Sequence, residues 1–251
     1  YGLVGSEMCI RDRSKGINVI NTPAASSKSV AELVFSHLFG CVRFLHESNR
    51  SMPLDGDSKF KELKKAYAGG KELAGKKIGI IGFGRIGQEV AKIAIGIGMN
   101  VIFYDKFIEE TSLDIEFFDG QNITFNLVSS TFDEVLENSD FISVHIPASD
   151  KYIIDSKQIG KMKDGVGLLN LSRGGIVNEE ELLKSINSGK VSFAGIDTFE
   201  NEPVPSMKLL MNSNISLTPH IGAATTEAQD RIGVELADKI NEISVSYTHL
   251  R

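Results

Sequence analysis

The sequence predicts an α/β protein built on a doubly wound parallel sheet. Its apolar runs are mostly continuous rather than alternating, as expected for strands buried on both faces of a parallel sheet. Helical segments lie between several of the runs, so that strand, turn and helix repeat along the chain. A doubly wound sheet accounts for both observations. The predicted strands are 78–82, 100–105, 140–147, 166–172, 191–199 and 215–220.

A short strand, a long helix and a polar arm are predicted ahead of this sheet. INVIN at 17–21 has the composition of a strand. From residue 30 to residue 45, apolar side chains recur at three- and four-residue spacing, and Ser29 and Glu32 are placed as a capping box. Residues 47–77 are polar and rich in turn formers, which favours a loop-and-helix arm that could pack on a partner subunit.

The helices of the repeating part follow from their periodicity and caps. The segment at 178–189 begins with Asn178 as its N-cap and carries three glutamates near the positive helix end. A last helix is predicted from residue 225 to residue 243. The other predicted helices are 87–98, 131–139 and 156–163.

Composition narrows the class of protein. With 251 residues and 41% hydrophobic residues, the chain can bury a sizeable core. A net charge of -6 without a basic stripe argues against nucleic acid as a partner, and no run approaches the roughly 18 apolar residues that cross a bilayer. Cys9 and Cys41 lack zinc-ligand spacing and are too few for a disulfide framework. We therefore expect a cytoplasmic protein with no metal, nucleic acid or membrane partner.

The turn after the first strand has the pattern of a dinucleotide-binding loop. GFGRIG contains Gly82, Gly84 and Gly87, follows a strand and opens a helix. Gly82 allows a tight turn, Gly84 lets a pyrophosphate approach the backbone, and Gly87 lets helix and strand pack closely. Asp105 ends the next strand, where it can bind both ribose hydroxyls and repel a 2′-phosphate, so NAD is favoured over NADP. The alternative is that the glycines only shape a turn.

Three polar residues follow the ends of later strands, where ligands bind in an open α/β sheet. Arg173 in NLSRGG can hold a carboxylate, Glu202 in FENEP supplies a carboxylate, and His220 in TPHIG supplies an imidazole suited to proton transfer near neutral pH. Each has another interpretation. His220 could be a hydrogen-bonded core residue, Glu202 a surface residue, and Arg173 the partner of an exposed glutamate.

Five segments together resemble one family. GKKIGIIGFGRIG, FISVHIPAS, LLNLSRGGIVNEEEL, FAGIDTFENEP and LTPHIGAAT occur in the order and spacing of the D-isomer-specific 2-hydroxyacid dehydrogenases. The resemblance covers nearly all of residues 15–243. Within the family, segments 16–35 and 217–233 are most similar to the short 3-phosphoglycerate dehydrogenases that lack a regulatory tail.

The resemblance implies roles for individual residues. His220 is the acid/base, Glu202 its orienting carboxylate, and Arg173 the clamp on the substrate carboxylate or carbonyl. Asp197 is implied to contact the nicotinamide carboxamide. His145 is interpreted as lining the adenine side, whereas His37 and His46 are expected to be structural. The other implied cofactor contacts are Arg85 and Ile86 at the pyrophosphate, together with Pro147, Leu171, Ser172, Arg173, His220, Ile221, Gly222 and Ala223.

The resemblance also divides the chain. Residues 1–14 and 244–251 look like translated adapter sequence and are expected to be foreign. Residues 15–24 are interpreted as a remnant of a second, flavodoxin-like substrate lobe, and 25–223 as a Rossmann NAD-binding domain with a dimerisation arm. Residues 224–243 would form a helix that returns to the substrate lobe. Since that lobe is mostly missing, we expect this polypeptide to bind a dinucleotide without efficient turnover.

The implied activity is NAD-dependent oxidation of a D-2-hydroxy acid by a homodimer. The favoured substrate is 3-phosphoglycerate, oxidised to 3-phosphohydroxypyruvate in the first step of serine biosynthesis. Two alternatives stay open. One is another dehydrogenase of the family, either a glyoxylate or hydroxypyruvate reductase or a D-lactate dehydrogenase. The other is a non-catalytic, corepressor-like protein that binds NAD.

Overall fold

The computed structural model describes residue 22 and residues 24–248. In this part of the chain a six-stranded parallel sheet forms the centre, in the order β2-β1-β5-β6-β7-β8. The order reverses between β1 and β5, which is the point where a doubly wound sheet binds its ligand. The predicted fold class is confirmed. The strands are β1 Lys77–Ile81, β2 Asn100–Tyr104, β5 Phe141–Val144, β6 Val166–Asn170, β7 Val191–Ile196 and β8 Ile215–Leu217.

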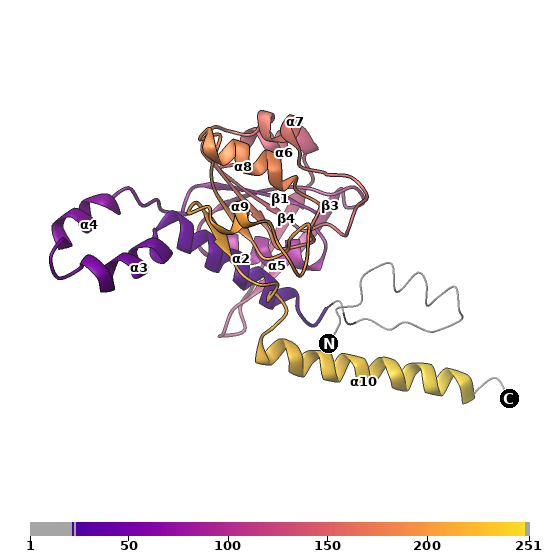
Figure 1. The fold of residues 1–251 in the computed structure, drawn as a ribbon. Helices are drawn as coiled ribbons and strands as arrows, with labels where there is room; N and C mark the ends of the chain where they lie inside the picture. The colour runs from indigo at the N-terminus through magenta and orange to yellow at the C-terminus, as the bar shows by residue number, and fades with distance from the viewer. Residues whose placement is uncertain (1–21, 23, 249–251) are drawn as a thin grey trace.

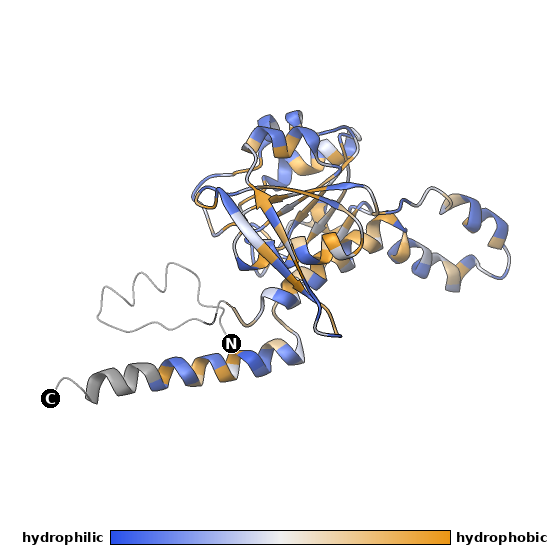
Figure 2. Ribbon diagram, turned by 180° about the vertical axis from the view of Figure 1, so that it is seen from behind, coloured by the Kyte–Doolittle hydropathy of each residue, from blue (hydrophilic) through white to orange (hydrophobic). Residues whose placement is uncertain are grey.

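Helices cover both faces of the sheet, and two hydrophobic clusters fill the layers between (Figures 1 and 2). Ile80 of β1 lies in the cluster with α2 and α5, whereas its neighbour Ile81 lies in the cluster with α6, α7 and α8. Successive side chains of a strand point to opposite faces, so both must be apolar. This explains the continuous apolar runs. The helices are α2 Ser27–Val42, α5 Arg85–Gly96, α6 Phe132–Asn138, α7 Ser156–Lys161, α8 Glu179–Asn187 and α9 Met207–Leu210.

The start of α2 differs from the prediction. Ser29 does not cap the helix, because α2 begins two residues earlier and Ser29 lies inside it, where its Oγ donates to the carbonyl of Gly222 at 2.7 Å. The helix also ends at Val42, so Leu45 starts the next helix and is 63% exposed. A serine at a buried helical position can bond a distant main chain as well as cap a helix, and the sequence pattern does not distinguish the two.

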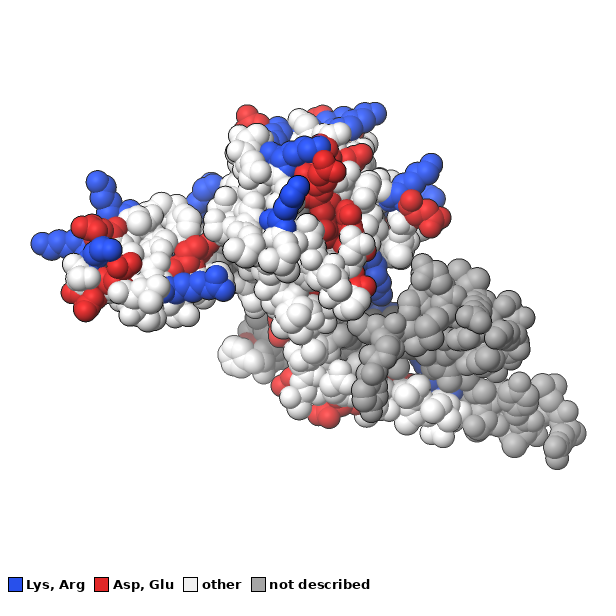
Figure 3. All heavy atoms as spheres, in the orientation of Figure 1, with Lys and Arg blue, Asp and Glu red and all other residues white. Residues whose placement is uncertain are grey.

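The polar stretch forms the predicted loop-and-helix arm. Its helices α3 (Leu45–Asp55) and α4 (Phe60–Ala66) project from the sheet domain (Figure 1). Neither helix contains a buried residue. Lysines and arginines are interspersed with acidic side chains over the arm and over the upper part of the sheet domain in Figure 3, whereas much of the surface between them is uncharged.

A hairpin of β3 (Glu110–Glu116) and β4 (Asn122–Val128) follows β2 and was not predicted. Only one of its faces is covered: Leu113 is buried in the α5 cluster, whereas Phe118 at the tip is fully exposed. The signal was present in the alternation of the two segments and in the Asp119-Gly120 turn, where Gly120 has φ +82°.

The last helix, α10, spans Thr226–Thr248 and lies apart from the sheet (Figure 1). It therefore continues beyond residue 243, into the segment expected to be foreign. Arg231 Nε ties its first half to the chain ahead of α2 by donating to the carbonyl of Ala25 at 2.9 Å. The predicted strand at 17–21 and head at 1–14 lie outside the described residues. No helix within residue 22 and residues 24–248 is long and apolar enough to span a membrane.

Candidate functional site

The three glycines of the turn after β1 meet different surroundings. Gly82 has φ +92°, and a Cβ there would lie 2.4 Å from the carbonyl oxygen of His145. A Cβ on Gly87 would lie 2.2 Å from the carbonyl oxygen of Gly82, so α5 can approach β1 only because this residue has no side chain. Around a Cβ on Gly84, by contrast, no described atom lies within 4 Å. The turn is thus closed on its inner side and open at Gly84, the N-cap of α5.

These surroundings fit the pyrophosphate and ribose of a dinucleotide. The first N–H groups of a helix have no partner within it and carry partial positive charge, which suits an anion beside Gly84. Asp105 stands next to the turn, because its Oδ2 accepts the N–H of Phe83 at 2.7 Å and its Oδ1 accepts that of Phe107 at 2.8 Å. Each carboxylate oxygen can accept two bonds, so Oδ2 keeps capacity for a ribose hydroxyl. Arg85 is exposed and Ile86 half-buried at the start of α5.

His145 follows β5 and packs behind this turn. Its Nε2 lies 2.8 Å from Ser143 Oγ, and its Nδ1 is buried and meets no hydrogen-bond partner among the described residues. Burial lowers the pKa of His145 to about 3, so the ring is neutral at physiological pH. Pro147, two residues later, is exposed. The predicted contacts of His145 with adenine and of Pro147 with the cofactor stay predictions.

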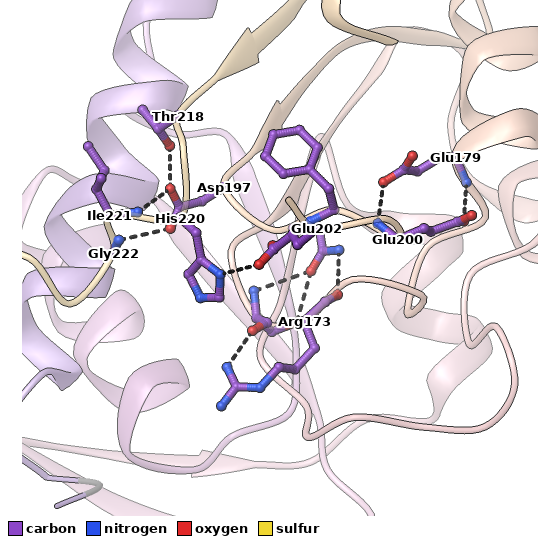
Figure 4. A network of polar contacts seen from close by, with 12 residues as sticks. Arg173, Glu179, Asp197, Glu200, Glu202, Thr218, His220, Ile221 and Gly222 are labelled. Carbon is purple, nitrogen blue, oxygen red and sulfur yellow. Dashed lines mark hydrogen bonds and ion pairs between the residues drawn. The ribbon is translucent and has the colours of Figure 1, made fainter. Parts of the chain in front are cut away.

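His220 and Glu202 meet beyond the ends of β7 and β8 (Figure 4). Nδ1 of His220 lies 2.9 Å from Oε2 of Glu202, and the other oxygen of Glu202 accepts the N–H of Phe199 at 3.0 Å. Partial burial raises the pKa of Glu202, but the bonds from His220 and Phe199 outweigh it and hold that pKa below its usual range. Because Nδ1–H donates to the carboxylate, the neutral imidazole keeps its lone pair on Nε2. The side chain of His220 is 29% exposed.

Arg173 extends from the loop after β6, and its charge helps to lower the pKa of Glu202. Its Nη1 donates to the carbonyl of Ser172 at 2.7 Å, which leaves the other N–H groups of the guanidinium for a carboxylate. Leu171 and Ser172 are buried, and their predicted contacts with the cofactor stay predictions. Asn170, which the sequence analysis missed, fixes the loop by donating to the carbonyl of Arg173 at 3.0 Å.

Asp197 is 1% exposed and holds the main chain around His220 (Figure 4). Its Oδ1 accepts the hydroxyl of Thr218 at 2.6 Å and the N–H of Ile221 at 2.8 Å, and its Oδ2 accepts the N–H of Gly222 at 2.8 Å. His220 between them has φ +55°, a left-handed conformation that a residue other than glycine adopts only under constraint. Ile221 is 41% exposed, Gly222 is buried and Ala223 is half-buried.

A separate cavity of about 110 Å³ lies where the arm leaves α2. It opens near Ser192 and Asn214, at the start of β7 and just before β8, and therefore at the opposite end of the strands from His220. Within the described part of the chain, no three His, Cys, Asp or Glu side chains gather in a way that could hold a metal ion.

Known proteins match this chain over most of its length. The family model for the NAD binding domain of D-isomer specific 2-hydroxyacid dehydrogenases matches residues 35–222. A hydroxypyruvate reductase of Thermotoga maritima is 45% identical over 91% of this chain, and a D-3-phosphoglycerate dehydrogenase of Methanocaldococcus jannaschii is 38% identical over 91%. A crystal structure of a glyoxylate reductase from Paecilomyes thermophila superposes with a TM-score of 0.72 at 31% identity over 90% of this chain.

The relatives are longer than this chain. It spans 70% of the Thermotoga protein, 41% of the Methanocaldococcus protein and 65% of the glyoxylate reductase. The matched region contains the glycine turn, Asp105, Arg173, Glu202 and His220. This chain belongs to the D-isomer specific 2-hydroxyacid dehydrogenases and carries their NAD binding domain.

Proposed function

We propose that this chain provides the cofactor site and the proton relay of an NAD-dependent dehydrogenase that interconverts a D-2-hydroxy acid and its 2-keto acid. The contact of 2.9 Å between His220 Nδ1 and Glu202 Oε2, beyond the carboxyl ends of the strands, carries the proposal. A carboxylate that orients an imidazole is the arrangement of a general acid/base, and a guanidinium for a substrate carboxylate stands in the neighbouring loop at Arg173.

The chain's own residues would move the proton and hold the acid. A bound nicotinamide supplies the chemistry of hydride transfer at the substrate C2. In oxidation, His220 Nε2 takes the proton of the 2-hydroxyl, and Glu202 stabilises the imidazolium through Nδ1–H. In reduction, the same Nε2–H returns a proton to the carbonyl oxygen. Arg173 would bind the substrate carboxylate through two parallel N–H···O bonds.

NAD rather than NADP is the cofactor we propose for this site. The carboxylate of Asp105 stands at the turn, where the adenine ribose arrives in a doubly wound fold. A 2′-phosphate there would place negative charge beside negative charge. Residues 82–87 would surround the pyrophosphate, and residues 171–173 and 220–223 would line the nicotinamide end.

Two substrate classes are supported by the relatives. We put hydroxypyruvate first, because the Thermotoga hydroxypyruvate reductase has 45% identity and this chain spans 70% of its length. The second is 3-phosphoglycerate with its keto acid, supported by the Methanocaldococcus relative at 38% identity. The two differ by a phosphate group, so a cationic pocket for that phosphate would distinguish them. Glyoxylate and lactate remain further candidates, and a corepressor-like protein that binds NAD without turnover is the non-catalytic alternative.

We further propose a cytoplasmic homodimer in which the arm contacts the partner subunit. The arm helices expose apolar side chains, with Leu45 at 63%, Leu54 at 79% and Phe60 at 58%. Exposed apolar side chains that gather on a projecting element favour a protein interface. Sedimentation equilibrium of the protein and of its Leu54→Asp variant tests this proposal, and a monomer at micromolar concentration in both would exclude it.

The activity is tested with the complete product of the gene and a panel of 2-keto acids, by following NADH oxidation. Hydroxypyruvate, 3-phosphohydroxypyruvate, glyoxylate and pyruvate form the panel. The matched control is His220→Asn, which we expect to bind NADH normally but to lose about two or more orders of magnitude in turnover. Near-normal turnover in the variant would remove His220 from its role. Tight NADH binding with no turnover on any member would favour the corepressor-like alternative.

A further inference from the structure

A second histidine lies behind the proton relay. His37 on α2 is 4% exposed, and both of its ring nitrogens are bonded: Nδ1 lies 2.7 Å from Ser216 Oγ, and Nε2 lies 3.0 Å from Thr218 Oγ1. Ser216 belongs to β8, and Thr218 follows that strand, two residues before His220. A buried imidazole with two polar partners is therefore attached directly to the segment that carries the acid/base.

The direction of these bonds follows from Asp197. A carboxylate oxygen can only accept a hydrogen bond, so the single hydroxyl hydrogen of Thr218 is donated to Asp197 Oδ1, at 2.6 Å. The Thr218 oxygen must then accept from His37, which places the ring hydrogen on Nε2. Nδ1 keeps its lone pair and accepts from the hydroxyl of Ser216. Burial lowers the pKa of His37 although the charge of Asp197 opposes it, which agrees with a neutral ring.

The series of hydrogen bonds that begins at His37 ends on the main chain on both sides of His220. Asp197 accepts the N–H groups of Ile221 and Gly222, each at 2.8 Å, and the N–H of His220 itself donates to the carbonyl of Thr218 at 3.0 Å. These bonds hold His220 in its left-handed conformation with φ +55°. A substitution of His37 would therefore affect these main-chain bonds through the hydroxyl of Thr218 and the carboxylate of Asp197.

We propose that His37 is a positioning residue for His220: by donating Nε2–H to Thr218, it commits the threonine hydroxyl to Asp197 and so fixes the loop that presents the acid/base. His37 does not touch the substrate. Its effect on turnover rests on the proposed function, whereas its effect on the geometry of the loop does not.

The competing explanation is that His37 only fills space. Its Cβ would be 2.9 Å from a Cβ on Gly195 of β7, so the packing between α2 and the sheet is close here. A space-filling role and a positioning role of His37 predict different activities for matched variants. His37→Leu removes the donor and keeps a similar bulk, and His37→Gln keeps an N–H near the position of Nε2. Thr218→Val removes the hydroxyl and preserves the shape of the side chain.

The experiment measures kcat, KM and NADH affinity for these variants and for the double variant His37→Leu/Thr218→Val. We expect His37→Leu and Thr218→Val each to lower kcat about tenfold or more with little change in KM, and His37→Gln to recover most of it. Because both single changes break one chain of bonds, the double variant should be no slower than Thr218→Val alone. Multiplied effects in the double variant, or a kcat of His37→Leu within twofold of the unchanged protein, would overturn the proposal.

A readout without turnover separates this inference from the proposed function. The chain has five histidines, so ¹⁵N-labelled histidine gives a resolvable NMR spectrum. We expect His37 as the neutral Nε2–H tautomer, and we expect the His220 signals to move in His37→Leu but not in His37→Gln. Unmoved His220 signals in both His37→Leu and Thr218→Val would refute the positioning role even in a protein that turns over. A failure of His220→Asn to reduce turnover would instead refute the proposed function alone.

Discussion

His145 gives a pH dependence of stability that can be worked out from the structure. Its Nδ1 is buried and unpartnered among the described residues, and burial lowers the pKa of the ring to about 3 from a usual value of about 6.5. In the unfolded chain the ring takes up a proton as pH falls through about 6.5, whereas the folded chain does so only near 3. Between these values the unfolded state binds more protons, so stability falls as pH falls.

The size of the effect follows from the two pKa values. Each pKa unit corresponds to about 1.4 kcal/mol, so the full difference approaches about 4 to 5 kcal/mol at the acid end. At pH 5 the loss relative to pH 7.5 is about 2 kcal/mol. Since a domain is typically stable by about 5 to 15 kcal/mol, this single ring is a sizeable fraction of the total.

Urea unfolding at pH 7.5 and pH 5 tests the reasoning in the unchanged protein and in His145→Gln. The glutamine cannot take up a proton in this range, so the variant should lose about 2 kcal/mol less between the two pH values. The same substitution at His46, whose side chain is exposed on the arm, serves as the control and should leave the difference unchanged. Equal pH dependence in the unchanged protein and His145→Gln would refute the account of a neutral, desolvated ring.

Four further substitutions have expected outcomes. Asp105→Ala should weaken NADH binding about tenfold and reduce the preference over NADPH, measured by fluorescence titration, because the carboxylate beside the turn is lost. Gly82→Ala should lower the thermal midpoint sharply, since a Cβ would meet a carbonyl oxygen at 2.4 Å, while Gly84→Ala should keep the midpoint and weaken NADH binding, because its Cβ enters open space. Glu202→Gln should lower kcat about tenfold to a hundredfold while NADH affinity stays within twofold.

The sheet could be predicted because each of its buried strands is a continuous apolar run, which can be recognised within one segment of the sequence. Each strand faces apolar helices on both sides, so the runs at β1, β5 and β6 are continuous and recognisable without knowledge of their neighbours. The β3–β4 hairpin has a weaker sequence pattern. One of its faces is exposed, so its alternating pattern competes with the loop interpretation of a polar segment.

The sequence allowed prediction of those site residues whose side chains follow the end of a strand. Arg173, Glu202 and His220 follow strands that run in parallel, so their convergence follows from topology. Asn170 and Thr218 were missed because they act on main-chain atoms or on another side chain across the fold. A polar residue with such a role looks the same in sequence as one that faces solvent.

Asp197 shows why a predicted ligand contact and a structural role need not exclude each other. Its carboxylate offers about four lone-pair positions, and Thr218, Ile221 and Gly222 occupy three of them. The remaining position is on Oδ2, which accepts only the N–H of Gly222 among the described residues. A carboxamide N–H at that position would displace no existing bond, but Asp197 is only 1% exposed, and the predicted contact stays a prediction. Since the three bonds also fix the loop that carries His220, filling the fourth would tie the nicotinamide end of the cofactor to the acid/base through one buried side chain.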